Sequence, residues 1–362
     1  MALPVMPPVR PMLAKSVKGI PDPAKVDGGL SYEPKWDGFR CIVFRDGDDV
    51  EMTSRNTRDL TRYFPELVTA FREHLPARCV LDGEIVVALD GRLEFEVLQE
   101  RIHPAASRIG LLAEQTPASY VAFDLLALGD DDLTGEPFEL RRARLVEALQ
   151  DAGAPVHTTR TTLDPAVAQE WFGQFEGAGL DGVVAKPLRA PYEQNARTMM
   201  KIKHERTADV VVAGYRLHKT STPELPLLGS MLLGLYNDEG VLQHVGVCAA
   251  FTAPRRAELA AELDQLAVPF AEHPWGRWAE AEAHEAGDRL PGAQSRWSAG
   301  KDLSFVPIRP ALVAEVAYEH MEGTRFRHTA RFKRWRSDRD PESCTYEQLE
   351  EVVSYDLADV LG

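Results

Sequence analysis

The sequence predicts an α+β fold divided into two domains. Its 362 residues are enough for two cores of ordinary size. Apolar, strand-like runs and helical patterns share the first two hundred residues, whereas short strands separated by turn residues dominate the chain after Lys203. We therefore place the boundary near Glu205, with a first domain of residues 1–205 and a second of residues 206–362.

The first domain combines several helices with strands that pair as hairpins. From Leu30 the chain reads as a strand, a turn around Asp37-Gly38 and a second strand. The other predicted elements are apolar strands at 79–88 and 118–127 and helices at 64–75, 140–150 and 165–177. Hairpin pairing without strand–helix–strand units predicts antiparallel sheets. The Pro-rich opening residues are expected to extend over a surface.

The second domain is predicted to be a small β-barrel. Strand-like segments fall at 210–215, 229–236, 241–247 and 313–318, and one helical stretch covers 254–266. About five strands with one helix suit a Greek-key barrel of the OB type, a fold that often binds nucleic acid.

The net charge and the local distribution of charge support different interpretations of the binding partner. A formal net charge of -15 argues against a nucleic-acid partner, because neutralising phosphates requires Lys and Arg. However, residues 325–336 are densely basic and interleaved with aromatics, while acidic residues gather around 272–288. The sequence is therefore compatible with an acidic enzyme that has one basic working face.

The sequence also predicts a cytoplasmic protein without a membrane segment. It contains no run of about 18 apolar residues, and its start lacks the layout of a signal peptide. The four cysteines are widely spaced, which suits a reducing compartment and argues against a structural zinc site.

The segment Glu33-Pro-Lys-Trp-Asp-Gly-Phe-Arg40 contains a candidate lysine nucleophile, Lys35. A lysine must lose its proton before it can attack, and its ordinary pKa is about 10.4, so an enzyme has to provide cations, metal or burial around it. Taken alone, the Lys-x-Asp-Gly pattern is a weak signal and fits a surface lysine before a hairpin turn better than a nucleophile. Its companions along the chain decide between these interpretations.

Those companions follow in a fixed order. Arg55 comes after the second strand, Glu84 in Leu-Asp-Gly-Glu is expected at the start of a buried strand, and Phe123 lies inside an apolar strand. Asp181 in Asp-Gly-Val-Val-Ala-Lys comes next, and the series closes with Lys201 and Lys203 in Met-Lys-Ile-Lys. Alternate residues of a strand share a face, so the two lysines are expected to point the same way.

In this order and spacing, the segments resemble the nucleotidyltransferase motifs of the covalent ligase and capping-enzyme superfamily. The resemblance covers nearly the whole chain. The length, the early lysine and the tail at 331–341 look most like the small LigC-like ATP-dependent DNA ligases of bacteria. It implies an adenylation (nucleotidyltransferase) domain of antiparallel sheets and helices, followed by an OB-fold β-barrel domain.

The resemblance also implies a role for each residue. Lys35 would attack the α-phosphorus of ATP and carry AMP, and Mg²⁺ (or Mn²⁺) would assist, with Glu84 and Asp181 as its candidate ligands. Glu33 would lie at the adenine edge, with Phe123 stacked on the base. The remaining residues would address the ribose and the phosphates: Arg40, Arg55, Glu84, Lys201, Lys203 and, from the second domain, Arg336, Asp338 and Arg339.

The sequence departs from the family pattern at three positions. Met199 stands where many relatives have Trp, Asp181 where Glu is commoner, and Arg339 where Lys is frequent. The shorter Asp181 side chain reduces the reach toward a metal by one methylene. The catalytic lysine and its cationic companions are all present.

Several rival functions use related chemistry. An RNA ligase or a GTP-using capping enzyme would share the lysine, but Glu33 and the long last motif favour ATP and DNA. NAD is disfavoured as AMP donor, because NAD-dependent ligases add a nicotinamide-recognising domain and a four-cysteine zinc element. A non-catalytic DNA-end-binding module is disfavoured because the site residues are intact.

The predicted substrate is nicked duplex DNA, contacted mainly through backbone phosphates. Relatives of this kind act in DNA repair, sometimes beside Ku or a primase-polymerase, and a monomer is expected.

Overall fold

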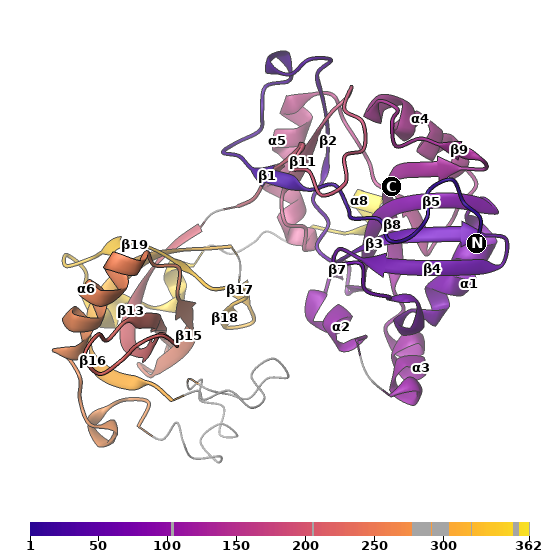
Figure 1. Cartoon of the computed structure of the whole chain (residues 1–362). Helices are drawn as coiled ribbons and strands as arrows, with labels where there is room; N and C mark the ends of the chain where they lie inside the picture. The colour runs from indigo at the N-terminus through magenta and orange to yellow at the C-terminus, as the bar shows by residue number, and fades with distance from the viewer. Residues whose placement is uncertain are drawn as a thin grey trace. The chain divides into compact units, whose positions relative to one another are not determined.

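The computed structural model describes residues 1–102, 105–204, 206–276, 291, 304–319, 321–349 and 355–361. The chain forms two compact units (Figure 1). One unit contains Met1–Lys203 together with Val352–Gly362, and the other contains His204–Glu351. Sheets and helices occur in the same unit, so the predicted α+β class is confirmed.

The larger sheet of the first unit has six strands: β3 (Phe39–Asp46), β4 (Asp49–Ser54), β5 (Arg78–Val86), β8 (Ser119–Leu128), β9 (Asp131–Asp132) and β10 (Val156–Thr158). They lie in the order β10–β8–β5–β3–β4, with β9 paired to β8. Every pairing is antiparallel except that of β10 with β8. The antiparallel prediction therefore holds for the centre of this sheet and fails at one edge.

Both faces of this sheet are buried, as the alternation along β3 shows. Cys41 and Val43 point into a cluster with side chains of the flanking helices, whereas Ile42 and Phe44 point into a second cluster on the opposite face. The predicted helices are present as α1 (Pro65–His74), α4 (Phe138–Ala148) and α5 (Pro165–Gln174), and two further helices are α2 (Phe95–Glu100) and α3 (Ala106–Gln115). The opening residues cover the second cluster with four apolar side chains: Leu3, Val5, Val9 and Met12.

The smaller sheet has four strands: β1 (Ala14–Ser16), β2 (Leu30–Pro34), β11 (Val183–Pro187) and β12 (Met199–Ile202). Their order is β1–β12–β11–β2, with β1 parallel to β12 and the other pairs antiparallel. Helix α5 covers this sheet, and its Ala168 is buried against Leu30, Tyr32 and Val183 (Figure 1).

The predicted hairpin around Asp37-Gly38 is wrong. The strands on either side of it belong to different sheets, β2 to the smaller and β3 to the larger. The reason lies in the contacts of residue 38, because a Cβ on Gly38 would lie 2.1 Å from the Ile85 carbonyl oxygen. The absent side chain lets β3 pair with β5 instead of folding back on β2, and Lys35 falls in the crossing between the sheets.

The second unit is a five-stranded antiparallel sheet that curls into a barrel. Its strands are β13 (Arg206–Leu217), β14 (Leu228–Tyr236), β15 (Leu242–Cys248), β16 (Val306–Tyr318) and β19 (Arg331–Trp335), in the order β15–β14–β13–β16–β19. A bridge between Cys248 and Ala330 joins the two edges. Helix α6 (Ala253–Asp264) contributes Leu259, Ala260 and Leu263 to the barrel core. This arrangement agrees with the predicted OB fold.

Short elements complete the described chain. Two hairpins pair β6 (Ala88–Leu89) with β7 (Arg92–Leu93) and β17 (Met321–Glu322) with β18 (Arg325–Phe326). The 3₁₀ turns are η1 (Pro23–Lys25), η2 (Thr61–Tyr63), η3 (Phe175–Ala178), η4 (Phe270–Glu272), η5 (Pro341–Ser343) and η6 (Tyr346–Gln348). All four cysteines are free and buried. Within the described residues, no helix has the length and apolar character needed to cross a bilayer.

The end of the chain returns to the first unit. The predicted second domain included residues 355–361, but in the structure these pack with residues of the first. Leu357 and Val360, the latter in helix α8 (Ala358–Leu361), are buried in a cluster with Trp36 and Phe123. The Leu357 N–H also donates to the Gly91 carbonyl, at 2.7 Å. The helical spacing of Leu357, Val360 and Leu361 makes an apolar face that needs such a surface.

Candidate active site

Lys35 is fixed by its backbone in the crossing between the two sheets. Its N–H donates to the Gly182 carbonyl, and its own carbonyl accepts the Asp181 N–H, each at 2.9 Å. Gly182 has φ +120°, and a Cβ there would lie 2.0 Å from the Ile202 carbonyl oxygen, so this position requires glycine. The segment Asp181-Gly182 is thereby held against the lysine.

A single carboxylate joins two of the predicted lysines. Oδ2 of Asp181 lies 2.6 Å from Lys35 Nζ and 2.8 Å from Lys203 Nζ. Burial raises the pKa of Asp181, but the charges and hydrogen bonds of the two lysines outweigh it and hold that pKa well below its ordinary value. Two ammonium groups and one carboxylate leave an excess positive charge, which suits a phosphate.

Two further cations extend this group. Lys201 lies in β12, and burial lowers its pKa, helped by the neighbouring charges of Lys203 and Lys35. The charge of Arg55, an exposed arginine in the turn after β4, acts on that pKa in the same direction. The structure therefore brings Lys35 and Lys203 together on Asp181, and the charges of Lys201 and Arg55 act on the same group. The roles assigned to these residues toward ATP stay predictions.

Glu33 forms a buried ion pair with Lys186. The Lys186 Nζ lies 2.8 Å from Glu33 Oε1, and both side chains are almost fully buried. Burial raises the pKa of Glu33, partly offset by Lys186. The other carboxylate oxygen, Oε2, is buried and finds no hydrogen-bond partner among the described residues. A buried acceptor in this state fits the exocyclic amine of an adenine. Lys186 was not predicted as a site residue, although it closes the motif that begins at Asp181.

Arg40 is held by a buried acid and lies over Phe123. Its Nε and Nη2 each donate to Asp82, at 2.5 Å, and the Tyr192 hydroxyl donates to the same carboxylate at 2.6 Å. The Arg40 guanidinium lies 4.5 Å from the Phe123 ring centre, and Lys186 Nζ lies 4.6 Å from it. An adenine stacked on Phe123 would take the place of one of these cations. Asp82 was also missed, although it stands two residues before Glu84.

Glu84 lies opposite Arg40 on the neighbouring strand, since β3 and β5 pair these two residues. The prediction that Glu84 begins a strand is wrong, because β5 starts at Arg78 and Glu84 is near its other end. The cause is that the apolar run before the Asp-Gly step already belongs to β5. Burial raises the pKa of Glu84 to about 7, against the opposing charges of Arg40 and Lys35.

The predicted metal ligands, Glu84 and Asp181, differ in how far their oxygens are already occupied. Within the part of the chain that the structure describes, no three His, Cys, Asp or Glu residues gather as a metal cluster. Glu84, near the lysine, offers hard oxygen donors, whereas Asp181 already accepts from two lysines. This partial set fits Mg²⁺, which keeps several waters and is completed by substrate phosphates.

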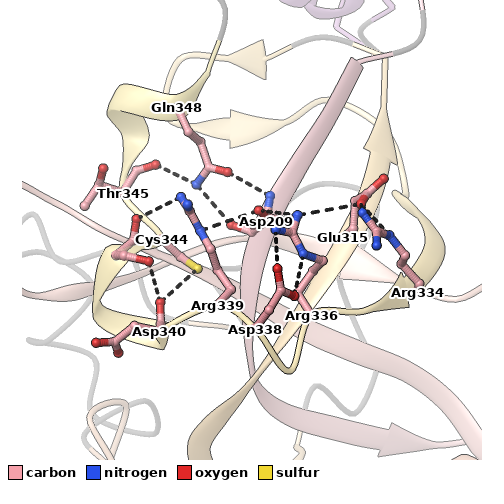
Figure 2. A network of polar contacts seen from close by, with 11 residues as sticks. Asp209, Glu315, Arg334, Arg336, Asp338, Arg339, Asp340, Cys344, Thr345 and Gln348 are labelled. Atoms are coloured by element: carbon pink, nitrogen blue, oxygen red, sulfur yellow. Dashed lines mark hydrogen bonds and ion pairs between the residues drawn. The ribbon is translucent and has the colours of Figure 1, made fainter.

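The three predicted residues of the second unit belong to a network of their own (Figure 2). Arg336 Nε and Nη2 donate to the two oxygens of Asp338, each at 2.9 Å. Its Nη1 donates to both oxygens of Asp209, at 3.0 and 2.9 Å. Arg339 Nε lies 3.5 Å from Asp209. Asp209 was not predicted; the only signal was an acid placed just before the apolar run Val210-Val-Val-Ala.

Comparison with known proteins identifies the class to which this fold and site belong. Residues 11–203 match the family model of the ATP dependent DNA ligase domain, and residues 226–339 match that of the ATP dependent DNA ligase C terminal region. The chain belongs to the ATP-dependent DNA ligase family, and it is an enzyme of that class.

Within this family the chain is LigC-like. It is 59% identical to DNA ligase C of Mycobacterium tuberculosis over 367 residues, which is 100% of this chain and 99% of the relative. It is likewise 59% identical to DNA ligase C2 of Mycolicibacterium smegmatis, over 97% of this chain and 96% of the relative. These identities set aside the RNA-ligase and capping-enzyme alternatives.

A solved structure from a study of Lig E DNA ligases shares the fold. It covers 90% of this chain and 99% of its own, with a TM-score of 0.52 and 16% sequence identity. At this identity the likeness concerns the fold alone.

Proposed function

We propose that this chain seals nicks in duplex DNA through an AMP carried on Lys35. In the first step the Lys35 Nζ forms a bond to the α-phosphorus of ATP, the bond to pyrophosphate breaks, and a proton leaves the nitrogen. AMP then passes to a DNA 5′-phosphate, and the neighbouring 3′-hydroxyl attacks that phosphate and releases AMP. The observation that carries this proposal is the Asp181 carboxylate shared by Lys35 and Lys203.

The first step depends mainly on position and charge. Asp181 holds the Lys35 amine at a defined place, 2.6 Å away. The surrounding cations, Lys201, Lys203 and Arg55, stabilise the negative charge that builds on the α-phosphate. Arg40, held by Asp82, acts on the same substrate from the larger sheet.

The base is recognised as adenine. The unpartnered Oε2 of Glu33 accepts a hydrogen bond from the adenine amine. Guanine carries a carbonyl oxygen at that position and would leave two acceptors facing each other, which favours ATP over GTP. Phe123 stacks on the base once it has exchanged one of its cation contacts.

Bound Mg²⁺ (or Mn²⁺) supplies charge neutralisation at the phosphates. Glu84 would hold it, and Asp181 is the second candidate ligand. Arg336, Asp338 and Arg339 of the second unit act on the leaving pyrophosphate.

We further propose how the enzyme contacts DNA and where it acts. The basic segment 325–336 contacts DNA phosphates, so binding is expected to weaken with salt. We assign the protein to DNA repair in the cytoplasm, as a monomer that works beside Ku or a primase-polymerase.

The test uses wild-type protein, Lys35→Ala and, as matched control, Lys25→Ala, an exposed lysine of η1. Each is incubated with α-labelled ATP and Mg²⁺, and the label that survives denaturing electrophoresis is measured. We expect label on wild type and Lys25→Ala only, released by nicked DNA as the strand is sealed. Intact mass would reveal protein that is already adenylylated. Label retained by Lys35→Ala would assign the nucleophile elsewhere.

A further inference from the structure

The network around Arg336 contains an acid that the proposed reaction does not use. Asp209 lies in β13 and is paired, across the strands, with Glu315 of β16 (Figure 2). Two carboxylates directly opposite each other repel unless a cation lies between them. Arg336 is that cation, at 2.9 Å from Asp209 and 3.8 Å from Glu315.

Both ends of the Arg336–Asp209 pair are fixed in the same sheet. The Asp209 N–H donates to the Gln348 side chain at 2.7 Å, and the Asp209 carbonyl accepts from that side chain at 3.0 Å. The Arg336 N–H donates to the Val313 carbonyl of β16, at 2.8 Å. The Asp209 side chain is only 13% exposed. The pair is therefore part of the unit's framework.

Asp338 differs from Asp209 in its exposure and in its location outside the strands of the sheet. Its side chain is 67% exposed, and it lies in the turn two residues after Arg336. It also occupies the other edge of the guanidinium, formed by Nε and Nη2. That edge carries two parallel N–H groups, the geometry in which arginine binds a phosphate bidentately.

The charges of this network explain why one acid has to leave. Arg336 with Asp209 and Asp338 carries an excess negative charge, which disfavours a triphosphate. Once Asp338 leaves, Arg336 and Asp209 remain as a neutral pair, the Nε–Nη2 edge is open to a phosphate, and the framework stays intact. Exchanging Asp209 would disturb β13 and give up the cation that Asp209 shares with Glu315.

We propose that Asp209 is a positioning residue for the first reaction step: it holds Arg336 by Nη1 and so presents the Nε–Nη2 edge to the triphosphate of ATP. Arg339, 3.5 Å from the same carboxylate, is kept alongside. The inference rests on the proposed function, because it takes Arg336 to act on ATP.

The test separates the first step from the later ones. Formation of the labelled lysyl-AMP is followed in single turnovers at several ATP concentrations. Sealing is measured separately on a nick that already carries AMP on its 5′-phosphate and needs no triphosphate. We expect Asp209→Ala to slow the first step by about tenfold to a hundredfold at saturating ATP, because a misplaced group costs up to that much. Sealing of the pre-adenylylated nick is expected to stay near wild type, although the melting temperature is expected to fall by a few degrees because Asp209 belongs to the framework.

Four further variants make the outcome decisive. Glu258→Gln removes an exposed acid of α6 and controls for the charge of the unit; we expect it to change neither step. Arg336→Ala is expected to slow the first step at least as much as Asp209→Ala. The double variant is expected to be no slower than Arg336→Ala alone, because Asp209 acts through Arg336. Asp209→Glu keeps the charge and is expected to restore part of the rate.

The possible failures are distinguishable. An unchanged first step in Arg336→Ala would refute the proposed role of Arg336 itself. A slow Arg336→Ala with a normal or faster Asp209→Ala would refute this inference alone. A parallel loss of both steps and of melting temperature in Asp209→Ala would mean that Asp209 serves folding only.

Discussion

The two units solve opposite electrostatic problems with the same kind of contact. In the first, one carboxylate, Asp181, is shared by Lys35 and Lys203, and the group keeps an excess positive charge. In the second, one guanidinium, Arg336, is shared by Asp209 and Asp338, and the group keeps an excess negative charge. The first group is ready for a phosphate, whereas the second has to exchange an acid first. The units also differ in how the group is built: backbone hydrogen bonds hold the first, and side chains hold most of the second.

The largest effect is expected from Gly182→Ala, which disrupts the backbone contacts that hold the first group in place. The new Cβ would meet the Ile202 carbonyl at 2.0 Å in a backbone conformation with φ +120°. We expect a loss of about 3–5 kcal/mol in the free energy of unfolding, at the upper end for a single substitution. Urea unfolding measures it. The matched control is Gly173→Ala in α5, where a Cβ meets nothing within 4 Å. It is expected to stabilise the protein by up to about 1 kcal/mol. Equal stability of the two variants would contradict the prediction.

The shared carboxylate is removed by Asp181→Asn. Lys35 and Lys203 would then repel each other without an acid between them, and the Lys35 amine would lose its fixed position. We expect lysyl-AMP formation to fall by about a hundredfold, equivalent to about 2.7 kcal/mol. Single-turnover labelling checks this, with Asp27→Asn, an exposed acid paired only with Arg189 in the described contacts, as control. A rate within threefold of wild type would rule out the role of the shared carboxylate.

The burial of Glu84 predicts a pH dependence of stability in the first unit. Its folded pKa, about 7, lies above its ordinary value of 4.5. The folded protein thus keeps a proton that the unfolded chain releases, so stability is lost as pH rises from 4.5 through 7. We expect wild type to lose on the order of 2 kcal/mol relative to Glu84→Gln across this range. Urea unfolding of metal-free protein in EDTA measures it, and identical pH profiles would contradict it.

The smallest effect is expected at the edge of the second network. Arg334 is 64% exposed and pairs with Glu315 at 2.7 Å. Exposed ion pairs contribute little, so Arg334→Ala is expected to change the free energy of unfolding by less than about 0.5 kcal/mol. Lysyl-AMP formation without DNA should also be unchanged. A larger loss of stability would show that Arg334 belongs to the framework that holds Arg336.

Local patterns predicted the elements well, whereas long-range pairing was beyond them. The periodicity of α1, α4 and α5 and the apolar runs of β5 and β8 are readable within a short window. The assignment of β2 and β3 to different sheets depends on a close approach of Gly38 to Ile85. These residues are too far apart in the sequence for a local pattern to indicate the contact. The chemical order of the site residues was predictable from the resemblance of their motifs to a family.

The supporting residues of the site were harder to predict. Asp209 and Arg336 are separated by 127 positions, and no pattern in either segment indicates that the two residues pair. Asp82 and Lys186 belong to the motifs that contain Glu84 and Asp181. Their partners, Arg40 and Glu33, lie on other strands. A single sequence shows which residues carry chemistry more readily than it shows which residues hold them in place.

The return of residues 355–361 to the first unit has a consequence for synthesis. Leu357 and Val360 complete the apolar cluster around Trp36 and Phe123. During translation those two rings are made early, and the segment that covers them emerges only after the whole second unit. Domains otherwise tend to fold as units in the order of synthesis. Here the earlier unit finishes its core last, so a ribosome stalled within the second unit would carry a first unit with an uncovered apolar face.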